Sequence, residues 1–244
     1  VSARVAWDVG ERVSVNSGII RVAGDFGRGN ALLDLDIPLA QESADKPLMS
    51  LVIGLSDTLA EYHKMLVPNV VSANLRDWLA NSIKGGRVSE GGFIYYGDLA
   101  GDDVLGRTVQ LALNVEDGNL QYHPQWPEVS KTTAYVSLAD DKLQVSSRRG
   151  EVMNSIVENV EVNMVASEGA SWLDISGDLR GPAEDVMTVL RDSPLAAITG
   201  HAFEQWRATG DYTAELKMNI PLDSEETPQV EILGSLNQAS LSNP

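Results

Sequence analysis

The sequence predicts a mainly β protein of the α+β class, an antiparallel meander with two or three short helices. The first observation is period-two alternation: between Val109 and Val115, apolar residues at odd positions are separated by Gln110, Ala112 and Asn114. The second is that clusters of glycine, aspartate and asparagine lie between such runs, at hairpin spacing. The third is that three segments show helical spacing instead. We therefore expect most of the chain to form strands with one apolar and one polar face.

The alternating runs define the apolar positions of the predicted strands. These positions are Val109, Leu111, Leu113, Val115, Val160, Val162, Met164, Leu173, Ile175, Leu216, Met218, Ile220, Val230 and Ile232. The same period-two alternation occurs at Leu33, Leu35 and Ile37, and again at Val136 and Leu138.

The first helical segment lies between residues 72 and 86. Its apolar face is formed by Leu75, Trp78, Leu79 and Ile83. Ser72 is a suitable N-cap, because its hydroxyl can accept a hydrogen bond from a backbone N–H that the helix leaves free. Gly85 and Gly86 are expected to end the helix.

Two further segments have helical spacing. A helix is predicted to start at Gly181-Pro182, because proline is favoured in the first turn, and to stop at Ser193-Pro194. Its apolar stripe is Val186, Val189 and Leu190. The third segment runs from Leu195 to about Trp206. These helices are too short to cover every strand, so either two sheets pack as a sandwich or one curved sheet leaves its apolar face as a trough.

A long internal repeat is also present. Gly24-Asp25-Phe26, Ile37-Pro38-Leu39 and Pro47 recur as Gly210-Asp211-Tyr212, Ile220-Pro221-Leu222 and Pro228. A truncated second copy indicates part of a repeating β array. We expect residues 1–58 to end one repeat, residues 59–192 to form a helix-plus-meander repeat with a closing helix, and residues 193–244 to start the next.

The composition excludes several function classes. The chain has 35 acidic and 18 basic residues, and its net charge of -17 repels nucleic-acid phosphates and weakens attraction to anionic membranes. It has no cysteine, which excludes disulfides and cysteine nucleophiles. The most apolar run, Leu48 to Leu55, is far shorter than the roughly 20 residues that span a bilayer. We expect a water-soluble, monomeric piece of a longer protein.

No motif indicates catalysis, a cofactor or a metal site. His63, His123 and His201 are far apart in the sequence, and we expect them to be surface or rim histidines. The five tryptophans, at positions 7, 78, 126, 172 and 206, are scattered, and we expect them to be core anchors rather than a base-stacking platform. The sequence thus predicts a protein that is not an enzyme.

The acidic pairs lie in polar turn contexts. They are Asp102-Asp103, Asp140-Asp141 and Glu225-Glu226, and we expect solvated loop charges rather than the two facing carboxylates of a polysaccharide-acting enzyme. Asp34 and Asp36 have a spacing compatible with calcium ligands, but the alternation of Leu35 and Ile37 favours a strand.

Three stretches resemble AsmA-like proteins of the YhdP type. In "LVPNVVSANLRDWLANSIKGGRVSEGGFIYYGDL", the matching positions are Leu66, Pro68, Leu75, Trp78, Leu79, Gly85 or Gly86, Val88, Gly97 and Leu99. In "GNLQYHPQWPEV" they are Tyr122, Pro124, Trp126 and Pro127, and in "GDLRGPAEDVMTVLRDSPLA" they are Gly177, Gly181, Pro182, Ser193, Pro194 and Leu195. The chain departs from the pattern at residues 100–103, where the family often has Pro-Phe.

The resemblance implies a segment of an inner-membrane-anchored envelope protein of Gram-negative bacteria. Its periplasmic part would be a long curved antiparallel sheet, a taco-like repeating β-groove that passes phospholipid or other acyl lipids towards the outer membrane. The apolar strand positions given above would line the groove, and Leu75, Trp78, Leu79 and Ile83 would form a helical cover. Adjacent repeats of the same chain, and other envelope proteins, would be partners. The alternative is a scaffolding β module that binds protein partners without lipid.

Overall fold

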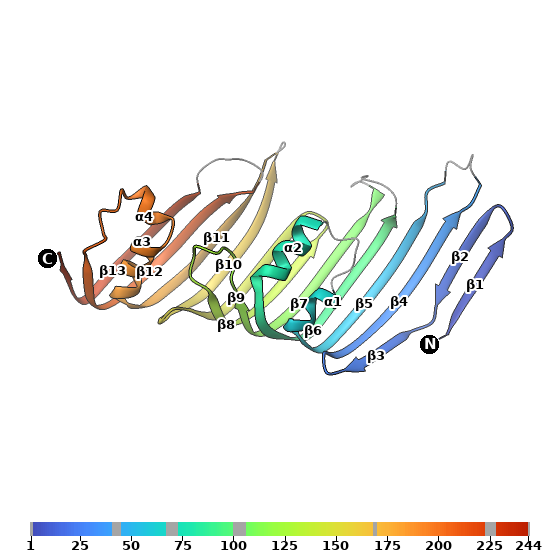
Figure 1. Cartoon of the computed structure of the whole chain (residues 1–244), viewed down its shortest axis with the longest axis horizontal. Coiled ribbons are helices and arrows are strands. Elements are labelled where there is room, and N and C mark those ends of the chain that lie inside the picture. The colour runs from blue at the N-terminus through green and yellow to red at the C-terminus, as the bar shows by residue number, and fades with distance from the viewer. Residues whose placement is uncertain are drawn as a thin grey trace.

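The computed structural model describes residues 2–40, 45–66, 73–99, 106–167, 170–222 and 228–243. These residues form one 13-stranded antiparallel sheet in which nearly every strand pairs with its neighbours in the sequence (Figure 1). Its strands are β1 (Ala3–Asp8), β2 (Arg12–Ser17), β3 (Ile20–Gly24), β4 (Gly27–Pro38), β5 (Leu48–Leu59), β6 (Ile83–Asp98), β7 (Thr108–Leu120), β8 (Val129–Ala139), β9 (Lys142–Val152), β10 (Ser155–Ser167), β11 (Ala170–Pro182), β12 (Arg207–Pro221) and β13 (Gln229–Ser242).

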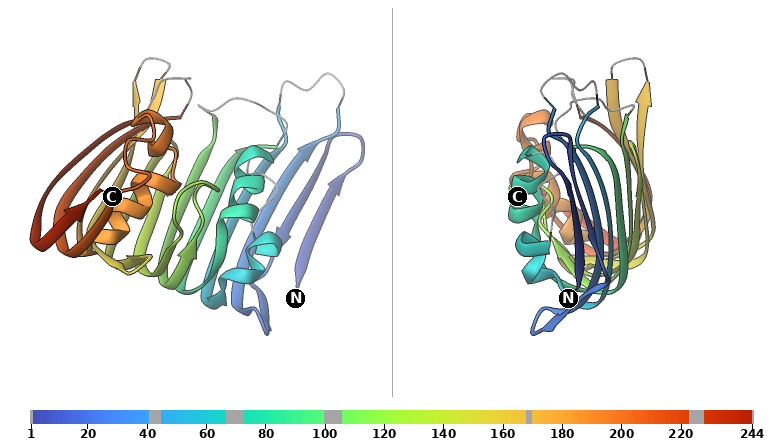
Figure 2. Two further views of the ribbon diagram at one scale, coloured as in Figure 1. Left: turned by 60° about the vertical axis from the view of Figure 1, so that its left-hand side comes forward. Right: turned by 90° about the vertical axis from the view of Figure 1, so that its right-hand side faces the viewer.

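The sheet is a single open layer, so the curved sheet is confirmed and the sandwich is wrong. It remains open because β1 and β13 lie at opposite ends of the strand order and do not pair with each other. Only β3 lies off the path, where it pairs with β4 beside β2. Seen along the sheet in Figure 2, the strands curve towards the side on which the helices lie.

The helices are short and lie on one side of the sheet (Figures 1 and 2). They are η1 (Ala60–Tyr62), α1 (His63–Leu66), α2 (Ala73–Ser82), α3 (Ala183–Asp192) and α4 (Leu195–Ile198). The predicted helix and its stop at Ser193 are confirmed as α3, but Pro182 is extended and caps the helix, which begins one residue later than predicted, at Ala183. The third predicted helix is wrong beyond Ile198, because the chain continues in turns up to Gln205.

The predicted end of the first helix is also wrong. The helix stops at Ser82, so Ile83, Gly85 and Gly86 belong to β6 rather than to a helical face and its cap. Gly86 has φ +126°, and a Cβ there would lie 2.8 Å from the Cα of Gly118 in β7. The glycine is therefore required by close strand contact at a bulge. The predicted N-cap Ser72 lies outside the described residues.

A line of left-handed residues crosses the sheet and marks where it bends. Several neighbouring strands contribute a residue with positive φ, namely Asp57, Gly86, Asp117, Lys131, Asn159, Gly210 and Gln238. The pairings of β6 with β7, β7 with β8, β8 with β9, β10 with β11 and β12 with β13 shift register near this line. Bulges bend a strand and increase its twist, so their alignment curls the whole sheet along one line.

Candidate functional site

Register places all the predicted apolar strand positions on one face of the sheet. Directly paired residues in antiparallel strands point to the same face, and apolar residues are paired from strand to strand. From β7 to β13 one such row is Leu113, Val136, Val145, Val162, Ile175, Met218 and Val230. A neighbouring row on the same face extends to the N-terminal strands, because Leu111 is paired with Phe93 and Phe93 with Ile53. We call this surface the inner face.

The inner face is half-buried rather than packed under a second layer. Of the fourteen predicted lining residues, all but Ile232, which is 55% exposed, have intermediate exposure. The most buried part of the inner face lies around Met49, Phe93 and Tyr95. These three side chains pack among Leu33, Leu51, Ile53, Val109 and Leu111. Period-two alternation does not identify β5 or β6 here. Apolar residues such as Val52 and Ile94 also occupy the opposite face, so these strands do not alternate.

Helix α3 lies over the inner face. Tyr212, which shares that face with Leu216 and Met218, is buried and forms a hydrogen bond with Ser155. Ser155 in turn donates to Asp185 of α3 over 2.7 Å. Burial raises the pKa of Tyr212 above its ordinary value, and its hydrogen bond with Ser155 offsets part of that effect.

Polar and apolar contacts hold α3 in place. The buried carboxylate of Asp185 also accepts hydrogen bonds from the backbone N–H and the side-chain amide of Asn154, over 2.9 and 3.0 Å. Ala183 and Met187 of α3 pack against Ala208, with Val186, Leu190 and Trp206 around them. The backbone N–H of Ala208 donates to Glu184, and this bond is the main cause of the lowered pKa of Glu184. The helix is thus fixed to the sheet at several points.

Helix α2 contacts the segment that follows β7 through Trp78. Trp78 is 44% exposed, so it is not the core anchor that the sequence predicts, and its indole N–H donates to the carbonyl of Tyr122 over 3.3 Å. Leu79 is half-buried, and the side chain of Leu75 lies outside the described residues. Trp7, 66% exposed in β1, also departs from the prediction. The role of α2 as a cover stays a prediction.

The segment 121–128, which we call the strap, lies between α2 and α3 in front of the sheet (Figure 1). The side-chain amide of Gln121 donates to the carbonyls of His123 and Trp126, over 2.7 and 2.6 Å, and its backbone N–H donates to Ser82 at the end of α2. Burial raises the pKa of Tyr122 to about 12. Helix α2, the strap and α3 therefore form a discontinuous layer on the inner-face side of the sheet, which we call the wall.

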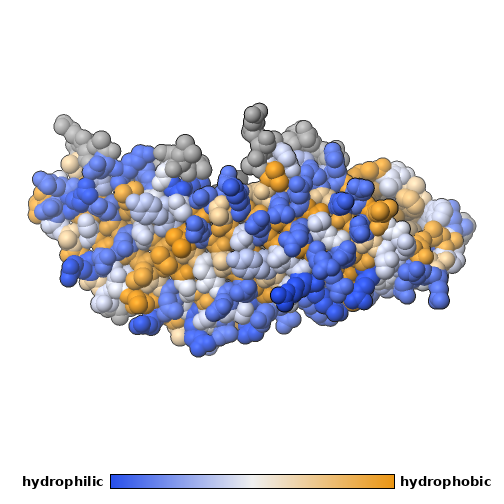
Figure 3. All heavy atoms as spheres, turned by 180° about the vertical axis from the view of Figure 1, so that it is seen from behind, coloured by the Kyte–Doolittle hydropathy of each residue, from blue (hydrophilic) through white to orange (hydrophobic). Residues whose placement is uncertain are grey.

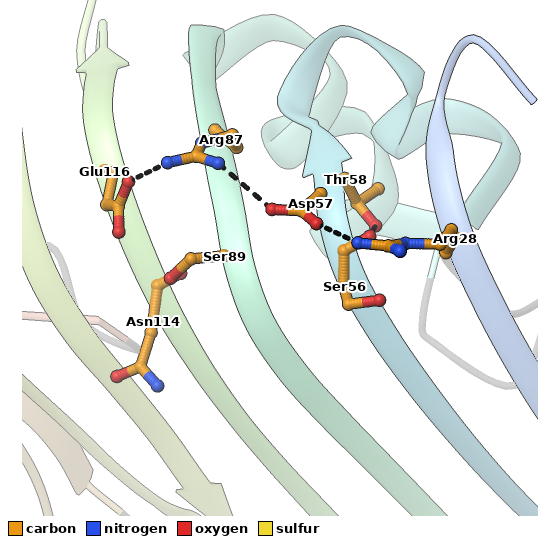
Figure 4. Close-up of polar contacts among 8 residues, drawn as sticks. All are labelled: Arg28, Ser56, Asp57, Thr58, Arg87, Ser89, Asn114 and Glu116. Atoms are coloured by element: carbon orange, nitrogen blue, oxygen red, sulfur yellow. Dashed lines mark hydrogen bonds and ion pairs between the residues drawn. The ribbon is translucent and has the colours of Figure 1, made fainter.

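The opposite, outer face carries the polar positions. Figure 3 shows it as a mixed surface, in which hydrophilic residues alternate with apolar patches. Across four strands near the bend, Arg28, Asp57, Arg87 and Glu116 form a ladder of alternating charge, in which Arg87 Nη1 lies 3.0 Å from Asp57 Oδ1 (Figure 4). Each strand of the ladder contributes one charge, so the ladder ties neighbouring strands together where the sheet is bulged.

Each of the three histidines makes a local polar contact. His63 Nδ1 lies 2.6 Å from the carbonyl of Ala60, His123 accepts a hydrogen bond from the backbone of Gln125, and His201 pairs with Glu204. Within the described ranges, no group of three potential metal ligands is close enough to hold an ion.

Among the acidic residues, Asp140 occupies the β8–β9 turn with φ +55° and accepts a bond from the backbone of Val109. The pairs at 102–103 and 225–226 lie outside the described residues. Asp34 and Asp36 lie in β4, as the alternation predicts, and bond to Asn16 and Arg12 of β2.

Comparison with known proteins identifies the family of this chain. The family model described as "YhdP protein" matches residues 2–242. The chain belongs to the YhdP family. A curated YhdP relative, the intermembrane phospholipid transporter YhdP of Escherichia coli (strain K12), is 21% identical over 188 residues, which cover 76% of this chain. The resemblance noted in the sequence is therefore confirmed.

The match covers only a small part of the relative's own length. The chain spans about 15% of the length of the E. coli protein. No solved structure matches the chain. None of the described helices has the length and apolar character needed to cross a membrane.

Proposed function

We propose that this chain is one segment of a phospholipid-transporting bridge, and that its inner face holds the acyl chains. The YhdP family assignment and the name of the E. coli relative support transport of phospholipid. The observation that carries the proposal is the unbroken row of paired apolar residues from Leu113 to Val230. No catalytic group takes part, and the segment works as a surface rather than as an enzyme.

The dimensions of the row suit an acyl chain. Neighbouring strands lie about 4.8 Å apart, so the row across β7 to β13 is about 29 Å long. That is about twice the depth of one leaflet of a hydrocarbon core about 30 Å thick. Each CH₂ removed from water contributes about 0.8 kcal/mol. Because the row is uniformly aliphatic, successive positions have similar binding energy, and a bound chain can move along it.

Within this proposal the segment lies in the periplasm, with neighbouring repeats of the same longer chain extending the sheet on both sides. The proposed direction of transport is towards the outer membrane. The strands at 33–37 and 216–220, which carry the Ile-Pro-Leu repeat, would then be equivalent positions in successive repeats. The polar outer face, with its charge ladder, faces water.

The proposal is tested by native mass spectrometry of the chain purified from a Gram-negative host without detergent, combined with lipid extraction. We expect phospholipid to co-purify and to be lost in the double variant Leu111→Asp, Val162→Asp. The matched control is Gln110→Glu, Asn163→Asp, which adds two negative charges on the outer face of the same strands. If lipid is absent, or is lost equally in both variants while both remain folded by circular dichroism, the scaffolding alternative gains support instead.

A further inference from the structure

A cleft opens in the wall between the strap and α3. It has a volume of about 580 Å³, within the range of small-molecule sites. Its lining includes Trp126, Glu128, Met153, Val189 and Asp192. It is therefore a recess lined by aromatic, aliphatic, acidic and uncharged polar side chains, on the side of the sheet that we propose to hold acyl chains.

The charge of the cleft is not neutralised by the basic side chains nearest to it in the sequence. Arg191, next to Asp192, turns away: its guanidinium donates to the carbonyl of Trp206 and pairs with Glu184 over 2.9 Å. Lys131, close to Glu128 in the sequence, pairs with Glu151 of β9 over 2.7 Å. None of the residues lining the cleft is basic. The cleft thus presents two exposed carboxylates beside an indole.

Both sides of the cleft are fixed in place. On one side, Gln121 holds the strap through the carbonyls of His123 and Trp126. On the other side, Asp185 fixes α3 to the turn between β9 and β10, and Met153 of that turn lines the cleft. A recess whose walls are already ordered loses little entropy when it binds a ligand.

We propose that this cleft binds the ammonium group of a zwitterionic, amine-bearing phospholipid headgroup while the acyl chains lie on the inner face. The inference rests on the proposed function and deepens it. Carboxylates attract an ammonium group, and the face of a tryptophan adds a cation–π contact. An anionic headgroup without an amine gains neither contact and is repelled by both carboxylates. The segment therefore prefers ethanolamine-type over glycerol-type headgroups.

The test separates headgroup binding from acyl-chain binding by using two kinds of probe on the whole chain. Dihexanoyl phosphatidylethanolamine and dihexanoyl phosphatidylglycerol, kept below their micelle concentrations, report both contacts. Glycerophosphoethanolamine, which has no acyl chains, reports the cleft alone. Binding is followed by NMR at the indole N–H of Trp126, and overall affinity by calorimetry.

We expect a five- to thirty-fold preference for the ethanolamine lipid. The variant Glu128→Gln, Asp192→Asn should abolish this preference and the shift caused by glycerophosphoethanolamine. The control Glu90→Gln, Glu231→Gln changes the net charge equally at exposed positions away from the cleft and should retain both. Equal affinity for the two lipids, or equal loss in both variants, overturns the headgroup proposal. A glycerophosphoethanolamine shift without any affinity for the acylated lipids would support the cleft and contradict the acyl-chain function instead.

Discussion

Replacing Asp185 with alanine should release α3 from the inner face. Asp185 is 6% exposed and accepts three hydrogen bonds, two from Asn154 and one from Ser155. Ser155 is 2% exposed, so the loss of its acceptor costs about 1–3 kcal/mol. Asn154 is exposed and its donors can bond to water, so they add about 0.5–1.5 kcal/mol. The expected decrease in the free energy of unfolding is therefore about 1.5–4.5 kcal/mol.

The measurement is urea unfolding of the Asp185→Ala variant together with hydrogen exchange of the α3 amides. The matched control is Asp192→Ala, at an exposed position on the same helix, which should change the free energy of unfolding by less than about 0.5 kcal/mol. We expect exchange to accelerate in α3 before the sheet strands. A variant as stable as its control, with unchanged protection of α3, would refute the view that this carboxylate anchors the helix.

Three further outcomes are expected. Gly86→Ala should destabilise the sheet by about 1–3 kcal/mol in urea unfolding, because the new Cβ meets the backbone of β7 at positive φ; an unchanged midpoint would contradict this. The absorbance difference between this chain and its Tyr122→Phe variant should show Tyr122 titrating with a pKa of about 12. The free energy of unfolding should fall as pH rises from 10 to 12, because Tyr122 ionises at a lower pH in the unfolded chain. A pKa near 10 would exclude its burial. Arg87→Ala should cost less than about 1 kcal/mol, with a smaller effect at high salt, because its partners Asp57 and Glu116 are exposed; a larger, salt-independent loss would refute this.

The strands could be predicted where only one of their faces is apolar. In β7 and β10 the polar neighbours of Leu111 and Val162 reveal the period of two, and register places both residues on the inner face. In β5 and β6, Val52 and Ile94 add apolar side chains to the outer face, and the period disappears from the sequence. Alternation identifies which strand face is apolar, but not whether a second sheet packs against it.

The wall was harder to predict because it depends on contacts distant in sequence. Gly86 resembles a helix cap locally, and only its closeness to Gly118 shows that it belongs to a strand bulge. The cleft joins the strap to α3, about 60 residues later, and no local pattern links Trp126 with Asp192. Asp185 could be recognised only as an acidic residue of the first helical turn, since its partners lie on another hairpin.

The most direct test of the central claim is a photo-crosslinking scan along β10. A photo-reactive phenylalanine derivative is placed in turn at positions 161, 162, 163 and 164, and the chain is incubated with vesicles of radiolabelled phospholipid. Val162 and Met164 lie on the inner face, whereas Glu161 and Asn163 point the other way. We predict strong labelling at positions 162 and 164 and little at 161 and 163. Uniform labelling, or labelling confined to 161 and 163, would contradict an acyl-chain site on the inner face.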